Sequence, residues 1–195
     1  MKHITSQINE ISRSVDTIDK EQFNKLVAAS LSTIEAGKKI IISGLGKNGP
    51  ICEKVADSMA SIGIPVDYIN TGTALHGSFG YIHDGDLIIL VSKSGNTSET
   101  IQVAQVIRSN RKCTIWGLTF KKDSELIQKN VINEALILNL DQEGDPWNIM
   151  PMNSTTVTLI VLQALALELI DKLGLTKADF LKNHPGGGIG KSNKL

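Results

Sequence analysis

The chain has 195 residues, and its 20 lysines and arginines balance its 20 aspartates and glutamates. This length predicts one compact domain over residues 1–195 with a substantial core. A net charge of zero gives no electrostatic reason to expect nucleic acid or an anionic membrane surface as a partner. The longest apolar run, 157–169, is too short for a bilayer, and the N-terminus lacks a signal-peptide core, which predicts a cytoplasmic protein.

The first part of the chain, residues 1–36, has the pattern of two helices. Asp19 stands where a helix would start, and apolar residues then recur at helical spacing until Gly37. This pattern predicts an amphipathic helix over 20–36. A shorter helix is expected before it, over 4–16.

From residue 38 the pattern changes to short β-branched apolar runs that alternate with helical ones. The runs are apolar on both faces, which is typical of a parallel sheet covered by helices on both sides. We therefore predict an α/β fold, a three-layer α/β/α doubly wound sandwich over 38–172 with a five-stranded parallel sheet. The expected strands are 39–42, 66–69, 87–91, 114–118 and 135–138, and the expected helices are 50–62, 97–109 and 153–172. A C-terminal helix and a glycine-rich tail complete the chain over 176–195.

The segment Ser43-Gly44-Leu45-Gly46-Lys47 follows the first expected strand and enters a helix. It lacks the third glycine and the acidic ribose ligand of a dinucleotide fingerprint, and it is not a Walker loop. What remains is a tight turn that offers backbone N–H groups, a hydroxyl and an ammonium. These groups suit a small anion, and the alternative is a glycine turn with a solvated lysine.

The segment 92–98 follows the third expected strand and carries four side-chain hydroxyls in seven residues, ahead of the next helix. Hydroxyls beside the free amides of a helix N-terminus suit a phosphate monoester. A helix cap would need only one or two such side chains, so phosphate binding is the favoured interpretation. Glu99 lies in the first turn of that helix, where a carboxylate is stabilised for structural reasons alone, so a structural and a functional interpretation both stay open.

Three further segments place titratable groups in loops: His76 in 72–77, Glu143 in 141–146, and His184 in Asn183-His184-Pro185-Gly186-Gly187. A lone loop histidine or an acidic loop residue is usually just solvated. The last segment is more suggestive, because its glycines let a ligand approach the backbone beside an imidazole. The two cysteines, Cys52 and Cys113, lie in apolar patterns and are expected to be free core thiols.

The segments 43–49, 72–77, 92–99 and 183–190, in this order, resemble the sugar isomerase (SIS) domain, and within it the arabinose 5-phosphate isomerase group. The resemblance runs from about Ile34 to Lys191 and implies a flavodoxin-like doubly wound fold. It implies a catalytic set of Lys47, His76, Glu99, Glu143 and His184. It also implies a phosphate site formed by Ser43, Gly44, Ser92, Ser94, Gly95 and Thr97.

The resemblance further implies that D-arabinose 5-phosphate and D-ribulose 5-phosphate are interconverted through an enediol. In this scheme Glu143 moves the proton between C2 and C1, His76 and His184 serve ring opening or oxygen protonation, Lys47 meets the developing charge, and Glu99 orients a partner. No cofactor and no metal are expected, because no pair of these residues has a metal-ligand spacing and the isomerases that the chain resembles need none. The resemblance implies a homotetramer, and we expect His184 to complete the site of an adjacent chain.

The chain departs from the family pattern at Ser78, where an acidic residue is usual, and at Lys93 and Asn96 in the phosphate loop. These departures leave open other SIS isomerases, acting on a 3-hexulose 6-phosphate or a sedoheptulose 7-phosphate. A non-catalytic sugar-phosphate sensor is the remaining alternative, although the 36 residues before the sheet leave no room for a helix-turn-helix domain. The chain stops soon after His-Pro-Gly-Gly, so we expect no control through the paired CBS regulatory module of many relatives.

Overall fold

The computed structural model describes residues 1–192, and within them five parallel strands form one sheet in the order β2-β1-β3-β4-β5. The strands are β1 (Ile40–Gly44), β2 (Val66–Asn70), β3 (Leu87–Val91), β4 (Thr114–Thr119) and β5 (Glu134–Ile137). Every pair of neighbouring strands is parallel. The predicted α/β class and its five-stranded parallel sheet are therefore confirmed.

The central strands explain why the sequence runs are apolar throughout. Every residue of β1 and of β3 is buried. Successive side chains of a strand point to opposite faces, so Ile40 and Ile42 join one hydrophobic cluster while Ile41 joins the other. A strand with a polar face could not occupy this position, because helices cover both sides of the sheet.

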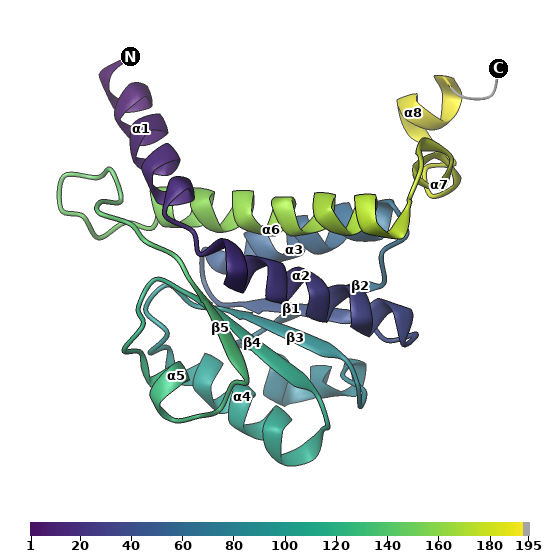
Figure 1. The fold of residues 1–195 in the computed structure, drawn as a ribbon, viewed down its shortest axis with the longest axis horizontal. Helices are drawn as coiled ribbons and strands as arrows, with labels where there is room; N and C mark the ends of the chain where they lie inside the picture. Colours follow the sequence, from purple (N-terminus) through teal and green to yellow (C-terminus); the bar gives the residue numbers. More distant parts are fainter. Residues whose placement is uncertain (193–195) are drawn as a thin grey trace.

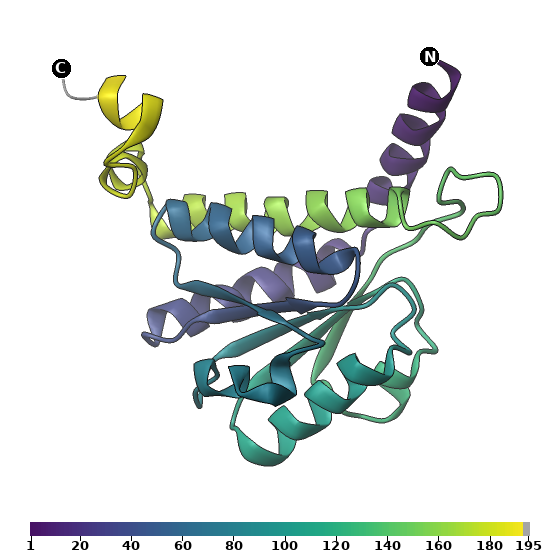
Figure 2. The same cartoon turned by 180° about the vertical axis from the view of Figure 1, so that it is seen from behind.

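Helices lie on both faces of the sheet (Figures 1 and 2). One face packs against α2 (Lys20–Glu35), α3 (Asn48–Ser61) and α6 (Asn153–Leu173), which share the larger hydrophobic cluster. The other face packs against α4 (Ser98–Asn110), α5 (Glu125–Gln128) and two short 3-10 helices, η1 (Ala74–His76) and η2 (Ser78–Tyr81). None of the helices in the described part of the chain is long and apolar enough to cross a membrane.

The two ends of the chain project from opposite ends of α6 (Figure 1). At one end is α1 (Lys2–Asp16), and at the other are α7 (Lys177–Lys182) and α8 (Gly187–Ser192). The second half of α1 is fixed to the segment after β5. There the Glu10 carboxylate accepts the Asp141 N–H at 2.7 Å, and the Ser14 hydroxyl donates to the Asn139 carbonyl.

The observed elements follow the predicted ranges closely, with three differences. The two 3-10 helices and α5 were not predicted, because each is only three or four residues long. Helix α3 begins at Asn48, two residues before the expected start, since Pro50 is tolerated in a first turn, where its missing N–H is not needed. The segment 176–195 forms two short helices, and its last three residues lie outside the described part of the chain.

Candidate functional site

The parallel strands bring their carboxyl ends, and the loops that follow them, to one edge of the sheet. The strand order places β1 between β2 and β3, so the connections that leave β1 and β3 diverge, which makes a crevice where ligands of such folds bind. The loops after β1 and β2 touch there, because a Cβ on Gly72 would lie 3.1 Å from Leu45 Cδ1. Most of the predicted site residues belong to the loops that follow β1, β2, β3 and β5.

The turn after β1 exists because of its glycines. A Cβ on Gly44 would lie 2.9 Å from Cys52 Sγ, and Gly46 has a φ of +59°, which side chains rarely adopt. The chain can therefore turn directly from β1 into α3, which leaves Lys47 exposed at the N-cap of that helix. The Ser43 side chain is buried and its Oγ lies 2.8 Å from Thr71 Oγ1, so it joins the β1 and β2 loops.

The turn after β3 is built by its own hydroxyls. Ser92 Oγ accepts the Gly95 N–H at 3.1 Å and lies 3.0 Å from Thr97 Oγ1, and Ser94 Oγ accepts the Asn96 N–H. Gly95 has a φ of +62°, and a Cβ there would lie 2.4 Å from Ser124 Oγ. Ser92 is buried, whereas Ser94 and Thr97 are half-buried. Of the three hydroxyls, those of Ser94 and Thr97 are therefore better placed to reach a ligand.

The start of α4 is open to an anion. Thr97 is its N-cap, and the described residues show no capping hydrogen bond from that side chain. The first-turn amides of a helix have no backbone acceptor within the helix, so a phosphate can take those of α4 that no side chain accepts, which leaves out the Glu99 N–H. Glu99 lies exposed in this turn, and hydrogen bonds from its own backbone N–H and from Ser98 Oγ, at 2.8 Å, lower its pKa.

Asn96 has a structural role that the sequence did not reveal. Its Oδ1 accepts the Glu125 N–H at 2.8 Å, and the Gly95 carbonyl accepts the Leu126 N–H at 2.9 Å. Both bonds fasten the turn after β3 to the start of α5. Asn96, a departure from the family pattern, thus uses its side-chain oxygen to hold the turn after β3 against α5.

His76 ends the 3-10 helix η1, and its side chain is exposed. Gly77, which follows it, has a φ of +111° and is the left-handed residue between η1 and η2, which begins at Ser78. The loop that carries His76 contains Gly72, which lies against Leu45 of the Lys47 loop. The structure therefore places Lys47 and His76 on adjacent loops.

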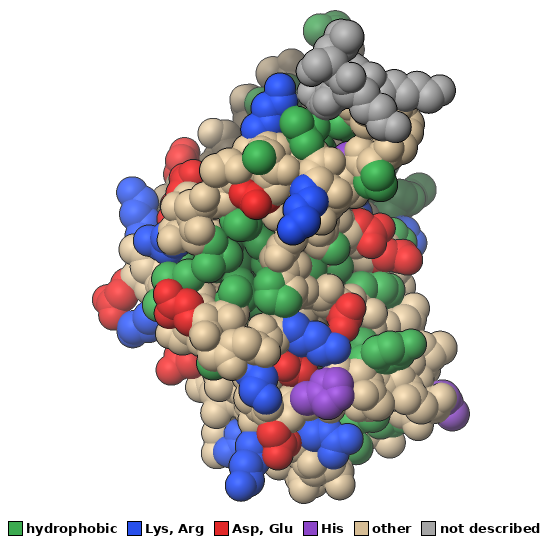
Figure 3. All heavy atoms as spheres, turned by 90° about the vertical axis from the view of Figure 1, so that its right-hand side faces the viewer, with side chains coloured by type: hydrophobic (Ala, Val, Ile, Leu, Met, Phe, Trp, Pro, Cys, Tyr) green, Lys and Arg blue, Asp and Glu red, His purple; other side chains and the backbone are tan. Residues whose placement is uncertain are grey.

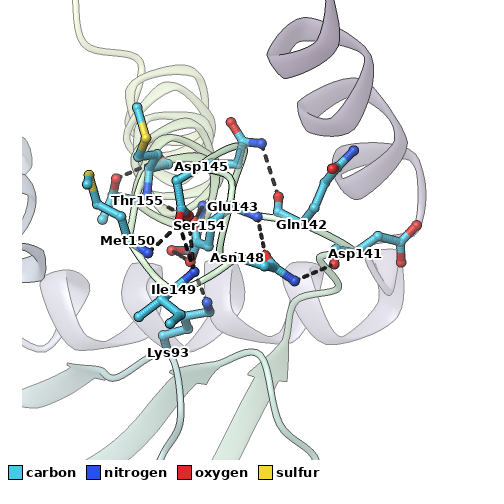
Figure 4. Close-up of polar contacts among 12 residues, drawn as sticks. Lys93, Asp141, Gln142, Glu143, Asp145, Asn148, Ile149, Met150, Ser154 and Thr155 are labelled. Atoms are coloured by element: carbon cyan, nitrogen blue, oxygen red, sulfur yellow. Dashed lines mark hydrogen bonds and ion pairs between the residues drawn. The ribbon is translucent and has the colours of Figure 1, made fainter. Parts of the chain in front are cut away.

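Glu143 lies at the centre of a buried polar network (Figure 4). Its carboxylate accepts the N–H groups of Met152 and Ser154, both at 2.9 Å, and the Ser154 hydroxyl, and it forms an ion pair with Lys93. Burial raises the pKa of this carboxyl, but Lys93 and the Ser154 and Met152 donors outweigh burial and lower it overall. Placed in this way, Glu143 connects the start of α6 with Lys93.

The loop that carries Glu143 is organised by its own polar side chains. The Asp145 carboxylate accepts the N–H groups of Trp147, Ile149 and Met150 at 3.0–3.1 Å. Asn148 Oδ1 accepts the Glu143 N–H at 2.6 Å (Figure 4). Asp145 makes these bonds from within its own loop, so this loop acid determines the shape of the loop.

His184 lies away from the other four predicted catalytic residues. Its ring stacks on Phe180 at a centroid distance of 3.9 Å, and its Nδ1 lies 2.7 Å from the Phe180 carbonyl. Glu143 contacts the start of α6, whereas α7 and His184 follow its end, and a helix of 21 residues is about 30 Å long. A single chain therefore does not bring His184 to the site.

A cleft of about 300 Å³ opens beside the turn after β3. It is lined by Lys93, Ser94, Phe120, Lys121, Leu140, Asp141 and Asn148. In the sequence, Lys93 stands out only as a departure from the family pattern, and nothing there indicates its pairing with Glu143, 50 positions later. Among the described residues, no three His, Cys, Asp or Glu side chains gather as they would around a metal ion.

The sequence was compared with models of known protein families. The family model of the SIS domain matches residues 33–168. The chain belongs to the SIS domain family. The SIS domain match covers the whole sheet and most of α6, and it includes four of the five predicted catalytic residues, all but His184.

Two curated relatives of this SIS domain are arabinose 5-phosphate isomerases named KdsD. The protein of Francisella tularensis is 32% identical over 195 residues, which cover 97% of this chain and 59% of that protein. The protein of Pseudomonas aeruginosa is 35% identical over 157 residues, 80% of this chain and 47% of that protein. The chain thus spans about half the length of these relatives.

Two solved structures resemble this SIS domain over nearly the full length of both chains. E. coli CFT073 c3406 in complex with arabinose 5-phosphate has a TM-score of 0.86 and 28% identity, and covers 94% of this chain and 95% of that chain. A putative sugar-phosphate isomerase from Listeria monocytogenes has a TM-score of 0.86 and 26% identity, with 95% and 94% covered.

Proposed function

We propose that the protein is an aldose–ketose isomerase that interconverts D-arabinose 5-phosphate and D-ribulose 5-phosphate through an enediol, without a cofactor. The observation that carries the proposal is the uncapped start of α4, preceded by the hydroxyl-rich turn Ser92–Thr97, at the same sheet edge as Lys47 and His76. The names of the relatives and the arabinose 5-phosphate complex of a structural neighbour support the choice of sugar.

The phosphate group would bind at the turn after β3. Its oxygens would take the first amides of α4 and the hydroxyls of Ser94 and Thr97, while the backbone of Gly95 allows a close approach. Ser43 and Ser92, both buried, hold the loops in shape, and Gly44 keeps the β1 turn narrow. The sugar would then extend across the crevice toward Lys47 and His76.

Isomerisation needs a base for the C2 proton and a cation for the enediolate oxygens. Lys47 would supply the charge, because it is exposed at the start of α3 and its position is set by the glycine turn. We assign the proton transfer to His76, since imidazole suits proton transfer near neutral pH and the Glu143 carboxylate is fully engaged. Glu99 would orient a sugar hydroxyl, and Glu143 would hold Lys93.

His184 would act in the site of an adjacent chain of a homotetramer. The position of His184 beyond the far end of α6 supports this arrangement. So do large exposed apolar side chains, including Trp147 at 71%, Ile149 at 74% and Leu167 at 62% exposure. The end of the molecule with α7 and α8 also shows hydrophobic side chains between its charges (Figure 3). Another subunit would cover such surfaces.

We also propose that the enzyme works in the cytoplasm. Cys52 and Cys113 are both free cysteines, and burial raises the pKa of Cys52 to about 12, which keeps its thiol unreactive. Free thiols of this kind suit a reducing compartment.

The deciding experiment incubates the protein with pentose, hexose and heptose phosphates in D2O and follows H2 exchange and product by NMR. Exchange and turnover of arabinose 5-phosphate would support the proposal. Preference for a 3-hexulose 6-phosphate or a sedoheptulose 7-phosphate would select another SIS isomerase. Binding without exchange on any sugar would contradict catalysis and favour a sensor.

A second experiment tests the shared site. Inactive His184→Ala protein is mixed with inactive Lys47→Met protein under conditions of subunit exchange. Partial recovery of activity is expected if His184 acts in trans, because some sites then combine one intact residue from each chain. No recovery in verified mixed oligomers would place His184 in its own subunit, and a monomer by light scattering would contradict the assembly.

A further inference from the structure

Lys93 joins the two loops that border the cleft. It is the second residue after β3, and its carbonyl accepts the Phe120 N–H at 3.0 Å and the Thr119 hydroxyl at 3.1 Å. Its side chain crosses to the other loop, where the ammonium pairs with the buried carboxylate of Glu143 (Figure 4). Both the backbone and the charged end of Lys93 are therefore held in place.

The Lys93 ammonium still has donors to offer. A lysine ammonium carries three N–H donors, and one oxygen of Glu143 engages it here. The side chain is 38% exposed, and it lines the cleft beside Ser94 of the turn after β3. The remaining donors are thus available on the side of the cleft that adjoins the proposed phosphate position.

The lining of the cleft holds two ammonium groups, those of Lys93 and Lys121, and one carboxylate, that of Asp141. The Glu143 carboxylate is stabilised by N–H groups at the start of α6 as well as by Lys93, so it does not depend on Lys93 alone. Asp141 pairs with Arg13 at 3.0 Å. Lys121 is exposed and adds a second ammonium to the lining. An anion entering the cleft therefore meets cationic groups that are only partly neutralised.

We propose that Lys93 is a further phosphate-binding residue of the site, with its ammonium held by Glu143 so that a spare donor contacts an oxygen of the phosphate ester bound at Ser94. Its contribution is specificity for a dianionic phosphate ester over the unphosphorylated sugar. The identity of the ester as a sugar phosphate rests on the proposed function, whereas the binding of phosphate to Lys93 does not.

The test measures the binding of inorganic phosphate to the full chain by titration calorimetry. Lys93→Met keeps the length of the side chain and removes the charge, and it should weaken phosphate binding at least about tenfold, as the loss of a charge-assisted hydrogen bond would. Lys93→Arg keeps the charge and should stay within about threefold of the wild type. The matched control is Lys25→Met, which breaks the exposed ion pair with Glu21 on α2 and should change binding less than about twofold.

Two results would overturn the proposal. One is wild-type protein that binds no phosphate, and the other is Lys93→Met protein that melts at a lower temperature yet binds phosphate like the wild type. The second result would make Lys93 a structural partner of Glu143 only. If Lys93→Met does not fold, Lys93→Gln and Lys93→Arg take its place, and the difference in phosphate affinity between them decides.

Kinetics with the turned-over sugar phosphate separate this proposal from the proposed function. Lys93→Met should raise KM about tenfold and leave kcat within about threefold, because the contact is the same in the ground state and the transition state. If the wild type turns over no sugar phosphate but loses phosphate affinity with Lys93, the isomerase assignment fails while the assignment of Lys93 stands.

Discussion

The charged and titratable residues on the two sides of the carboxyl edge of the sheet differ in their exposure to solvent. On the β1 and β2 side, Lys47 and His76 are exposed on loops shaped by glycines. On the β5 side, Glu143 is fully buried among donors from Lys93, Met152 and Ser154. The first kind of residue is exposed to solvent, whereas the second joins the turn after β3 to the start of α6. The contrast separates charged groups that are exposed on turns from a buried charged group that holds two loops together.

The largest effect should come from removing Glu143. Glu143→Ala leaves the N–H groups of Met152 and Ser154 and the Lys93 ammonium without their shared acceptor. We expect a loss of about 4 kcal/mol in the free energy of unfolding, measured by urea denaturation. The control Glu21→Ala, on an exposed carboxylate, should cost less than about 1 kcal/mol. A loss below about 1 kcal/mol for Glu143→Ala would contradict the structural role.

Lys47→Met tests the other side of the comparison. Because Lys47 is exposed, its replacement should leave the melting temperature unchanged. Loss of its charge should lower kcat about 10²- to 10³-fold, or about 3 kcal/mol of barrier, as for other oxyanion stabilisers. The measurement is steady-state turnover of the sugar phosphate beside a thermal melt. A clear fall in the melting temperature that accompanies the loss of turnover would instead give Lys47 a structural role.

Gly95→Ala should have an intermediate effect on stability. The positive φ and the approach to Ser124 Oγ oppose any side chain at this position. We expect a cost of about 2 kcal/mol in the free energy of unfolding, together with weaker phosphate binding. Gly80→Ala is the matched control, since the described residues beyond its own turn place no atom within 4 Å of where its Cβ would stand, and it should cost less than about 0.5 kcal/mol.

The smallest expected effect is the pH dependence that the charge of Glu143 gives to the stability of the fold. The pKa of the Glu143 carboxyl is lower in the folded protein than in the unfolded chain. The ionised carboxylate therefore contributes its full stabilisation above the ordinary glutamate pKa of about 4.3, and this stabilisation is lost as the pH falls through the folded pKa. Unfolding measured between about pH 7 and pH 3 should show this loss. Glu143→Gln should be less stable at neutral pH and lose less stability on acidification than the wild type. Parallel pH profiles would argue against a charged Glu143.

The sequence predicts the sheet and its helices well because their signals are local. Each strand is a short β-branched run, and the helix after Asp19 is capped as its sequence indicates, with the Asp19 carboxylate accepting the N–H groups of Glu21 and Gln22. The turn after β3 was also visible, because hydroxyls and a glycine in sequence produce it. Periodicity and caps need no knowledge of distant residues.

The chemical state of each site residue could not be predicted in the same way. Glu143 looks like a solvated loop acid, and its burial depends on Lys93 and on the start of α6. Asn96 looks like a ligand-facing residue, but it caps α5, a helix too short to leave a pattern. The separation of His184 from the others follows from the length of α6. These facts are long-range, so only the folded chain reveals them.

The attachment of α1 has a practical consequence for handling the protein. Residues from Glu10 to Thr17 clasp the segment 139–142, whereas Met1, Ile4 and Ile8 are exposed. A protease that trims the first eight residues would leave the clasp intact, and an affinity tag fused at Met1 would point away from it. Trimming past Ser14 would remove the hydrogen bonds from Glu10 and Ser14 to Asp141 and Asn139, and the loop with Glu143 would lose its attachment to α1.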